Sequence, residues 1–192
     1  MITEYQQRLR ELYLAAPVVP APEPWRAVHT GEIAVGGLLG IGFAVHPETG
    51  HDLVMVVSST GHGLLSAVTG ERIARDRDPL TDPEDSPDLV CPGLGPVAGV
   101  PVRIAGLHGG GLHTGAGGGW TVEVVRPDWP HDRVILFGPG GRIDQGPPGG
   151  MCWHILHSRH STLRAAGFSP SGRTLVVATS SGITLWTRPA TV

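Results

Sequence analysis

Residues 167–186 read GFSPSGRTLVVATSSGITLW, and this stretch decides the fold. A Pro/Gly turn precedes the apolar run Leu175–Ala178, and Ser-Ser-Gly separates that run from Ile183–Trp186. Short β-branched runs bounded by Gly, Pro and Ser predict strands that are joined by tight turns. Because Leu175–Ala178 contains no polar residue, we expect it to form a strand that is covered on both faces. The stretch therefore predicts an antiparallel meander.

The same layout occurs earlier in the chain. Residues 42–61 read GFAVHPETGHDLVMVVSSTG, with a Gly-Phe pair, a Pro/Gly turn, an apolar strand and a Ser-Ser turn in the same order. Residues 129–137, WPHDRVILF, look like a third, degenerate copy. An internal repeat predicts a fold that is built by repeating one supersecondary unit, which here is a meander of short strands.

The later copy resembles a blade of a WD-repeat β-propeller. Residues 168–173 look like the turn between the first two strands of such a blade, and Ile183–Trp186 looks like its third strand. Thr187 stands where the family has Asp, and the family's Gly-His pair is absent before residue 163. The resemblance implies a scaffold whose family mostly binds proteins and peptides. At about 40–45 residues per blade the β portion holds at most about four blades, which excludes a seven-bladed ring.

Similar runs extend the β prediction over residues 27–192. We predict an all-β fold, mainly an antiparallel meander arranged as a small or incomplete propeller or as a sandwich, with one N-terminal helix. Within the β domain, residues 76–92 are acidic and Pro-rich, and they predict a long exposed loop. The strands are expected at residues 32–35, 40–45, 52–58, 63–68, 71–75, 100–107, 120–125, 133–137, 151–156, 163–168, 174–178 and 183–186.

The N-terminal unit, residues 1–26, has a different pattern. Thr3 and Gln6 form a capping-box signature, and Pro17 ends the helix that they begin. The predicted helix carries one apolar stripe, made of Tyr5, Leu9, Leu12 and Tyr13. We expect this stripe to pack on the β domain. The alternative is that the helix docks to a partner. The Pro-rich residues 17–26 predict an extended spacer.

Composition excludes several classes of function. The 192-residue chain has a formal charge of −3 and no basic stripe, so we expect no nucleic-acid partner. No run of about 18 apolar residues is present, and residues 1–8 are not a signal peptide, so we expect no membrane span and a cytoplasmic location. All fourteen basic residues are Arg, which is typical of a GC-rich bacterial genome such as an actinobacterial one. Cys91 and Cys152 are too few for a disulfide scaffold.

Histidines supply the candidate metal ligands. His154 and His157 share a face on a helix but fall on opposite faces of a regular strand. His108 and His113 flank a Gly-rich connection and are further candidates for Zn²⁺, and we expect no other cofactor. The Gly-rich connection lacks the Gly-Lys-Ser/Thr ending of a phosphate loop, and no Gly-x-Ser-x-Gly nucleophile elbow is present.

A binding surface is the remaining candidate site. Trp and Arg are enriched in protein interfaces. The cluster Arg126, Trp129, His131 and Arg133, together with Trp120, is therefore our predicted partner-binding surface. The alternative is that each Trp packs under a loop and fills the core. The favoured hypothesis is a non-enzymatic protein-binding module, such as a bacterial inhibitor or immunity-type partner. The alternatives are a metal-dependent hydrolase that uses the histidines and a subunit of a larger β assembly.

Overall fold

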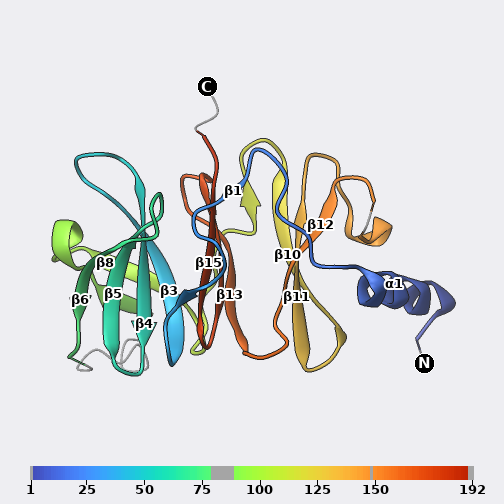
Figure 1. Cartoon of the computed structure of the whole chain (residues 1–192), viewed down its shortest axis with the longest axis horizontal. Coiled ribbons are helices and arrows are strands. Elements are labelled where there is room, and N and C mark those ends of the chain that lie inside the picture. The colour runs from blue at the N-terminus through green and yellow to red at the C-terminus, as the bar shows by residue number, and fades with distance from the viewer. Residues whose placement is uncertain (1, 79–88, 148, 190–192) are drawn as a thin grey trace.

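The fold is all-β with one N-terminal helix (Figure 1). The computed structural model describes residues 2–78, 89–147 and 149–189. Its strands form three antiparallel sheets, which we name the curled, central and outer sheets. They stand in a row, with the central sheet in the middle and the helix at the far side of the outer sheet (Figure 1). The repeat predicted from the sequence appears as three meanders, one in each sheet.

The curled sheet contains the first copy of the repeat. A buried cluster that includes Leu53, Met55, Leu64 and Val102 lies inside its curl. A 3-10 turn, η2 (Gly95–Val97), supports one end of that cluster. In spatial order its strands are β6 (Arg72–Asp76), β5 (Gly61–Ser66), β4 (Asp52–Ser58), β3 (Leu38–Val45), β8 (Pro101–Gly106) and β7 (Val90–Pro92).

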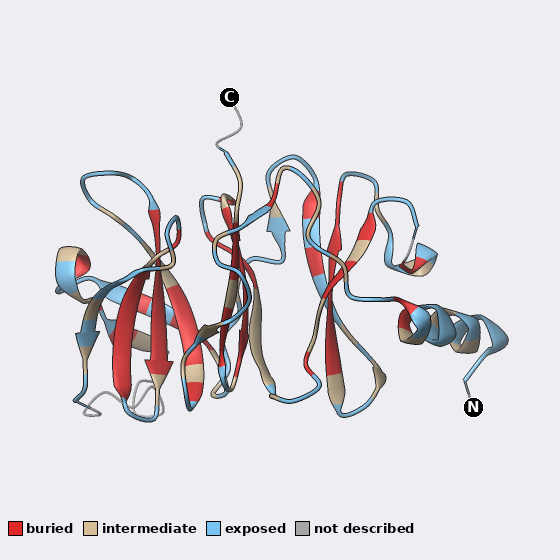
Figure 2. Ribbon diagram, in the orientation of Figure 1, coloured by how far each residue is buried: buried red, intermediate tan, exposed pale blue. Residues whose placement is uncertain are grey.

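The central sheet contains the second copy of the repeat, and every residue of β14 is buried. One face of β14 packs against β4 through Val176, Ala178, Val54 and Val56. The other face belongs to the cluster shared with the outer sheet, so the prediction of a strand covered on both faces is confirmed (Figure 2). The strands are, in spatial order, β1 (Arg26–Ala27), β15 (Gly182–Thr187), β14 (Thr174–Thr179) and β13 (Leu163–Phe168), with β2 (Ile33–Ala34) also paired to β15.

The outer sheet contains the third meander. Its inner face carries Trp120, Val122 and Leu136, which pack against the central sheet. Its other face carries Ile135 and Phe137, which helix α1 (Glu4–Ala15) covers through Tyr13. The strands are, in spatial order, β12 (Cys152–His157), β11 (His131–Phe137), β10 (Trp120–Asp128) and β9 (Gly115–Ala116).

Helix α1 begins with the predicted capping box, in which Thr3 and Gln6 exchange hydrogen bonds. Its packing on the outer sheet starts at Leu9, which lies partly buried against the cluster. Tyr13 is buried and donates a hydrogen bond to the Ile143 carbonyl in η3 (Ile143–Gln145), whereas Tyr5 is exposed. Within the described residues, no helix has the length and apolar content needed to cross a bilayer.

The prediction of a spacer at residues 17–26 is wrong. Trp25 is buried against Trp120 and Phe168 in the cluster between the central and outer sheets. Arg26 begins β1, which pairs with the end of β15, and the Val19 amide donates to the His154 carbonyl at the edge of β12. The segment therefore crosses both sheets and belongs to the β domain. A large aromatic residue at the end of a Pro-rich run is the sequence signal for this.

The prediction of one loop over residues 76–92 also needs correction. Asp76 is the last residue of β6, and Val90–Pro92 forms β7 with the buried Cys91 at its centre. β7 pairs with β8 and forms one edge of the curled sheet. Residues 79–88, which carry most of the predicted acidic loop, lie outside the described residues.

Candidate binding site at the hairpin between β10 and β11

Trp129 lies at the tip of the hairpin between β10 and β11. β10 ends at Asp128 and β11 begins at His131, so Trp129 and Pro130 form the turn. The Trp129 side chain is 80% exposed, the largest exposure among the described large hydrophobic residues. An indole that leaves water on binding contributes a large apolar area with few rotatable bonds. The turn thus presents an aromatic group of the kind that anchors protein interfaces.

Arg133 and Asp128 join the two strands directly below this tip. The Arg133 guanidinium donates through Nε to Asp128 Oδ1 at 3.3 Å and through Nη2 to Oδ2 at 3.2 Å. The Arg133 side chain is 5% exposed and the Asp128 side chain 30%. The hydrogen bond from Arg133 lowers the pKa of Asp128 below its usual value, so the carboxylate is charged at neutral pH. This ion pair fixes the two ends of the turn relative to each other.

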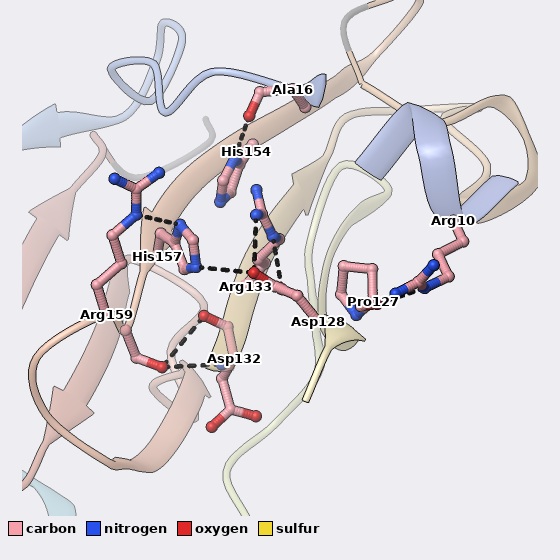
Figure 3. Close-up of polar contacts among 10 residues, drawn as sticks. Arg10, Ala16, Pro127, Asp128, Asp132, Arg133, His154, His157 and Arg159 are labelled. Atoms are coloured by element: carbon pink, nitrogen blue, oxygen red, sulfur yellow. Dashed lines mark hydrogen bonds and ion pairs between the residues drawn. The ribbon is translucent and has the colours of Figure 1, made fainter. Parts of the chain in front are cut away.

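A second ion pair, between Arg126 and Asp132, lies on the other side of the hairpin. The Asp132 side chain is buried, whereas Arg126 remains largely exposed. The Asp132 backbone is held to the end of β12 by Ser158, whose Oγ accepts from the Asp132 amide at 2.9 Å and whose amide donates to the Asp132 carbonyl at 2.9 Å. The hairpin base is therefore connected to the next strand as well as across itself (Figure 3).

Two hydrogen bonds connect the N-terminal segment to the hairpin and to the neighbouring strand β12. Arg10 Nε donates to the Pro127 carbonyl at 2.7 Å, and Nδ1 of the buried His154 donates to the Ala16 carbonyl at 3.0 Å (Figure 3). Both contacts join residues that are more than a hundred positions apart in the chain. The tip thus projects from a base that is connected to β12 and to helix α1.

His154 and His157 lie on the same face of β12, contrary to the prediction for a regular strand. The pairing of β11 with β12 shifts between Val134 and Ile135, so that Ile155 is an extra residue in β12. A bulge of one residue shifts the alternation of side chains along the strand, so the side chains at positions 154 and 157 lie on the same side. Their ring centroids are 5.9 Å apart. A bulge is set by tertiary pairing, and the sequence of β12 gives no clear signal for it.

In the part of the chain that the structure describes, the two histidines have no further ligands beside them that would complete a metal centre. Nδ1 of His154 is engaged by the Ala16 carbonyl, and Nδ1 of His157 accepts from Arg159 Nε at 3.0 Å. Burial lowers the pKa of both rings, and the positive charge of Arg133 lowers the pKa of His157 further. Within the described residues, no group of three or more His, Cys, Asp or Glu side chains has the arrangement of a metal site.

The other predicted site residues lie elsewhere. His113 forms a bridge with Phe168 of the central sheet, and His108 lies beside a small hollow at the end of β8, so neither joins His154. Trp120 is buried between the central and outer sheets and is not on a surface. Of the predicted partner-binding residues, the structure brings Arg126, Trp129, His131 and Arg133 together, but Arg133 is buried beneath the tip.

Sequence reasoning missed Asp128 and Asp132, which pair with the two arginines. Their signal was present, because opposite charges follow one another on either side of the Trp-Pro turn in residues 126–133. Comparison of the chain with protein-family models, with curated proteins and with solved structures finds no match in any of the three.

Proposed function

We propose that this domain is a non-enzymatic protein-binding module that engages its partner through the β10–β11 hairpin, with Trp129 as the anchor. The exposure of the Trp129 indole carries the proposal. The two ion pairs and the contacts to Ser158 and Arg10 support it, because a tip that is already ordered loses little conformational entropy when it binds.

The charges around the tip favour one kind of partner surface. Arg126 and Arg159 are both exposed beside the hairpin base. No carboxylate among the described residues pairs with Arg159, and its Nε contacts His157. We therefore favour a partner with an apolar pocket for the indole and acidic side chains around it. A bacterial inhibitor or immunity-type role in the cytoplasm fits this kind of contact, and the buried, unpaired Cys91 and Cys152 support that location.

The test is capture of the partner from an extract of the source cells by the immobilised domain, with quantitative mass spectrometry. Trp129→Ala should reduce recovery of a specifically captured protein by about thirtyfold, since interface tryptophans contribute roughly 2 kcal/mol or more. Leu107→Ala is the matched control, because it removes another exposed apolar side chain far from the hairpin. Equal recovery by the wild type and Trp129→Ala would reject the tip as the contact surface.

A further inference from the structure

A cavity of about 570 Å³ lies where the curled sheet meets the segment around β2. β4, β5 and β6 supply one side of it, and residues 33–36 supply the other. Its volume is within the range of small-molecule sites, roughly 300–1,000 Å³. None of the hairpin residues lines this cavity, so it is independent of the function proposed above.

Strand register places two arginines on the cavity side of the curled sheet. Arg75 pairs with Gly63, which pairs in turn with Val56, and Arg72 pairs with Leu65. Paired residues in neighbouring strands point to the same face. Val56 and Leu65 belong to the cluster between the curled and central sheets, which identifies that face as the inner one. The arginines therefore border an apolar floor formed by Val56 and Leu65.

His62 also borders the cavity, but the alternation of side chains along β5 places its ring away from the apolar floor. His62 precedes Leu64 by two positions in β5, and Leu64 packs inside the curl of the sheet. The His62 ring therefore points to the opposite face, and we assign it no part in the cavity.

The two guanidinium groups have no partner among the described residues. Neither Arg72 nor Arg75 makes a side-chain hydrogen bond or an ion pair there, and no described residue that lines the cavity is acidic. The arginines of a second cavity differ: Arg173 donates to the Gly50 carbonyl at 2.6 Å and Arg188 to the Gly117 carbonyl at 2.7 Å. The donors of the first cavity remain available to a ligand.

The backbone conformation at residue 63 does not require glycine, yet glycine at this position keeps the cavity open. Its φ is not in the left-handed region, and an added Cβ would lie 3.5 Å from both the Ala74 carbonyl oxygen and Val56 Cγ2, which is ordinary contact. A β-branched residue is the usual choice in the interior of a strand. The absence of a side chain at this position leaves free the space between the two arginines and the apolar floor.

We propose that this cavity binds a small organic oxyanion, with its carboxylate or phosphate held by Arg72 and Arg75 and its apolar body on Val56 and Leu65. The planar guanidinium donates two parallel hydrogen bonds to either kind of oxyanion. The hydroxyl-bearing turn Ser58–Thr60 borders the same cavity and supplies further polar contacts.

Calorimetric titration of the full chain tests the site with four probes: phenyl phosphate, phenylacetate, neutral 2-phenylethanol and inorganic phosphate. We expect one or both aromatic anions to bind, and to bind more weakly at high salt. The anion that binds more tightly identifies the oxyanion class. Equal binding of 2-phenylethanol, equal binding of inorganic phosphate, or no binding of any probe at millimolar concentration would overturn the proposal.

Variants identify the residues involved. Arg72→Gln and Arg75→Gln should each weaken binding about tenfold or more, because a hydrogen bond to a charged group contributes roughly 1.5–3 kcal/mol. Arg103→Gln is the control, since Arg103 is exposed on β8 of the same sheet and lies outside the cavity. A loss with Arg103→Gln as large as with Arg75→Gln would indicate attraction by net charge and refute the site.

Gly63→Val provides a second test, because it fills the cavity without removing either arginine. The added methyl groups enter the cavity, so binding should be lost while the melting temperature is unchanged or higher. Retained binding in a folded Gly63→Val protein would contradict the proposal. If this variant does not fold, the arginine variants decide the question.

Discussion

Arg133 and Trp129 are four positions apart but have different environments. The indole is in water, whereas the guanidinium is buried against Asp128. Both were predicted to be contact residues, because Trp and Arg are enriched in interfaces and the sequence does not show how deeply each side chain is buried. Substitution of these two residues therefore separates binding from stability.

Arg133→Ala should lower the free energy of unfolding by about 2–3 kcal/mol. Removing one member of a fully buried ion pair costs roughly 3–5 kcal/mol, and the loss is smaller here because Asp128 retains contact with water. Urea denaturation measures the change. Arg103→Ala, at an exposed site, should stay within about 0.5 kcal/mol of the wild type. A wild-type midpoint for Arg133→Ala would mean that the ion pair does not support the hairpin.

Protonation of the buried histidines should destabilise the protein in mild acid. The pKa values of His154 and His157 are lowered in the folded state by burial, so below about pH 6.5 the unfolded chain binds more protons than the native one. The contribution of the neutral rings is therefore complete above about pH 6.5. It is lost as the pH falls toward the folded-state pKa values, by at most about 1.4 kcal/mol per pH unit for each ring.

His154→Gln tests this directly. Glutamine keeps a donor for the Ala16 carbonyl but does not titrate, so the free energy of unfolding should fall less steeply between about pH 7 and pH 5. The decline at lower pH should remain, because the lowered pKa of Asp128 places its contribution below about pH 4. Parallel pH profiles for the wild type and the variant would contradict the assignment.

At the scale of elements, the curled and central sheets are joined by a buried carboxylate. Asp52, at the start of β4, is 4% exposed. Its Oδ2 accepts hydrogen bonds from Ser169 at 2.8 Å, Ser171 at 2.6 Å and Thr174 at 2.8 Å, all near the start of β14. The two copies of the repeat therefore make a polar contact at this end in addition to their apolar one.

Asp52→Ala should lower the free energy of unfolding by about 2–4 kcal/mol, since it leaves the buried hydroxyls of Ser169 and Thr174 without their acceptor. A double-mutant cycle with Thr174→Val measures the coupling between β4 and β14, and we expect a coupling energy of about 1 kcal/mol or more. Additive effects in the cycle would show that the two strands are held together by apolar packing alone.

The element scale is also where the sequence was most informative. The Val and Leu runs and the turns between them predicted β4 and β14 closely, because burial on both faces and tight turns are local signals. β1 and β7 were missed because each is two or three residues long and exists through pairing with a distant strand. The bulge at Ile155 was missed for the same reason. The site followed this division: Trp129 was named as a candidate contact residue from its composition, whereas neither its exposure nor the histidine geometry followed from the sequence.

At the scale of the whole molecule, the three sheets share two apolar interfaces, and we expect them to unfold together. The cysteines report on this, because Cys91 is buried in the curled sheet and Cys152 under helix α1. Burial raises the pKa of each thiol to about 11, so little thiolate is present in the folded protein.

Thiol labelling at increasing urea concentrations measures the opening of each end of the molecule. Cys91→Ala and Cys152→Ala leave one reporter each, and both variants should label with the same midpoint. A lower midpoint for Cys152 than for Cys91 would mean that the outer sheet and helix α1 open independently of the rest.

The pairing of β1 with β15 has a consequence for how the protein is made. The central sheet needs Arg26 and Thr187 side by side, so it cannot be completed until β15 has left the ribosome. Until then Trp25 and the apolar residues of β14 have no cover from that strand. Trp25 therefore lacks this cover while the residues between β1 and β15 are being made, and protection by chaperones is most needed before β15 pairs.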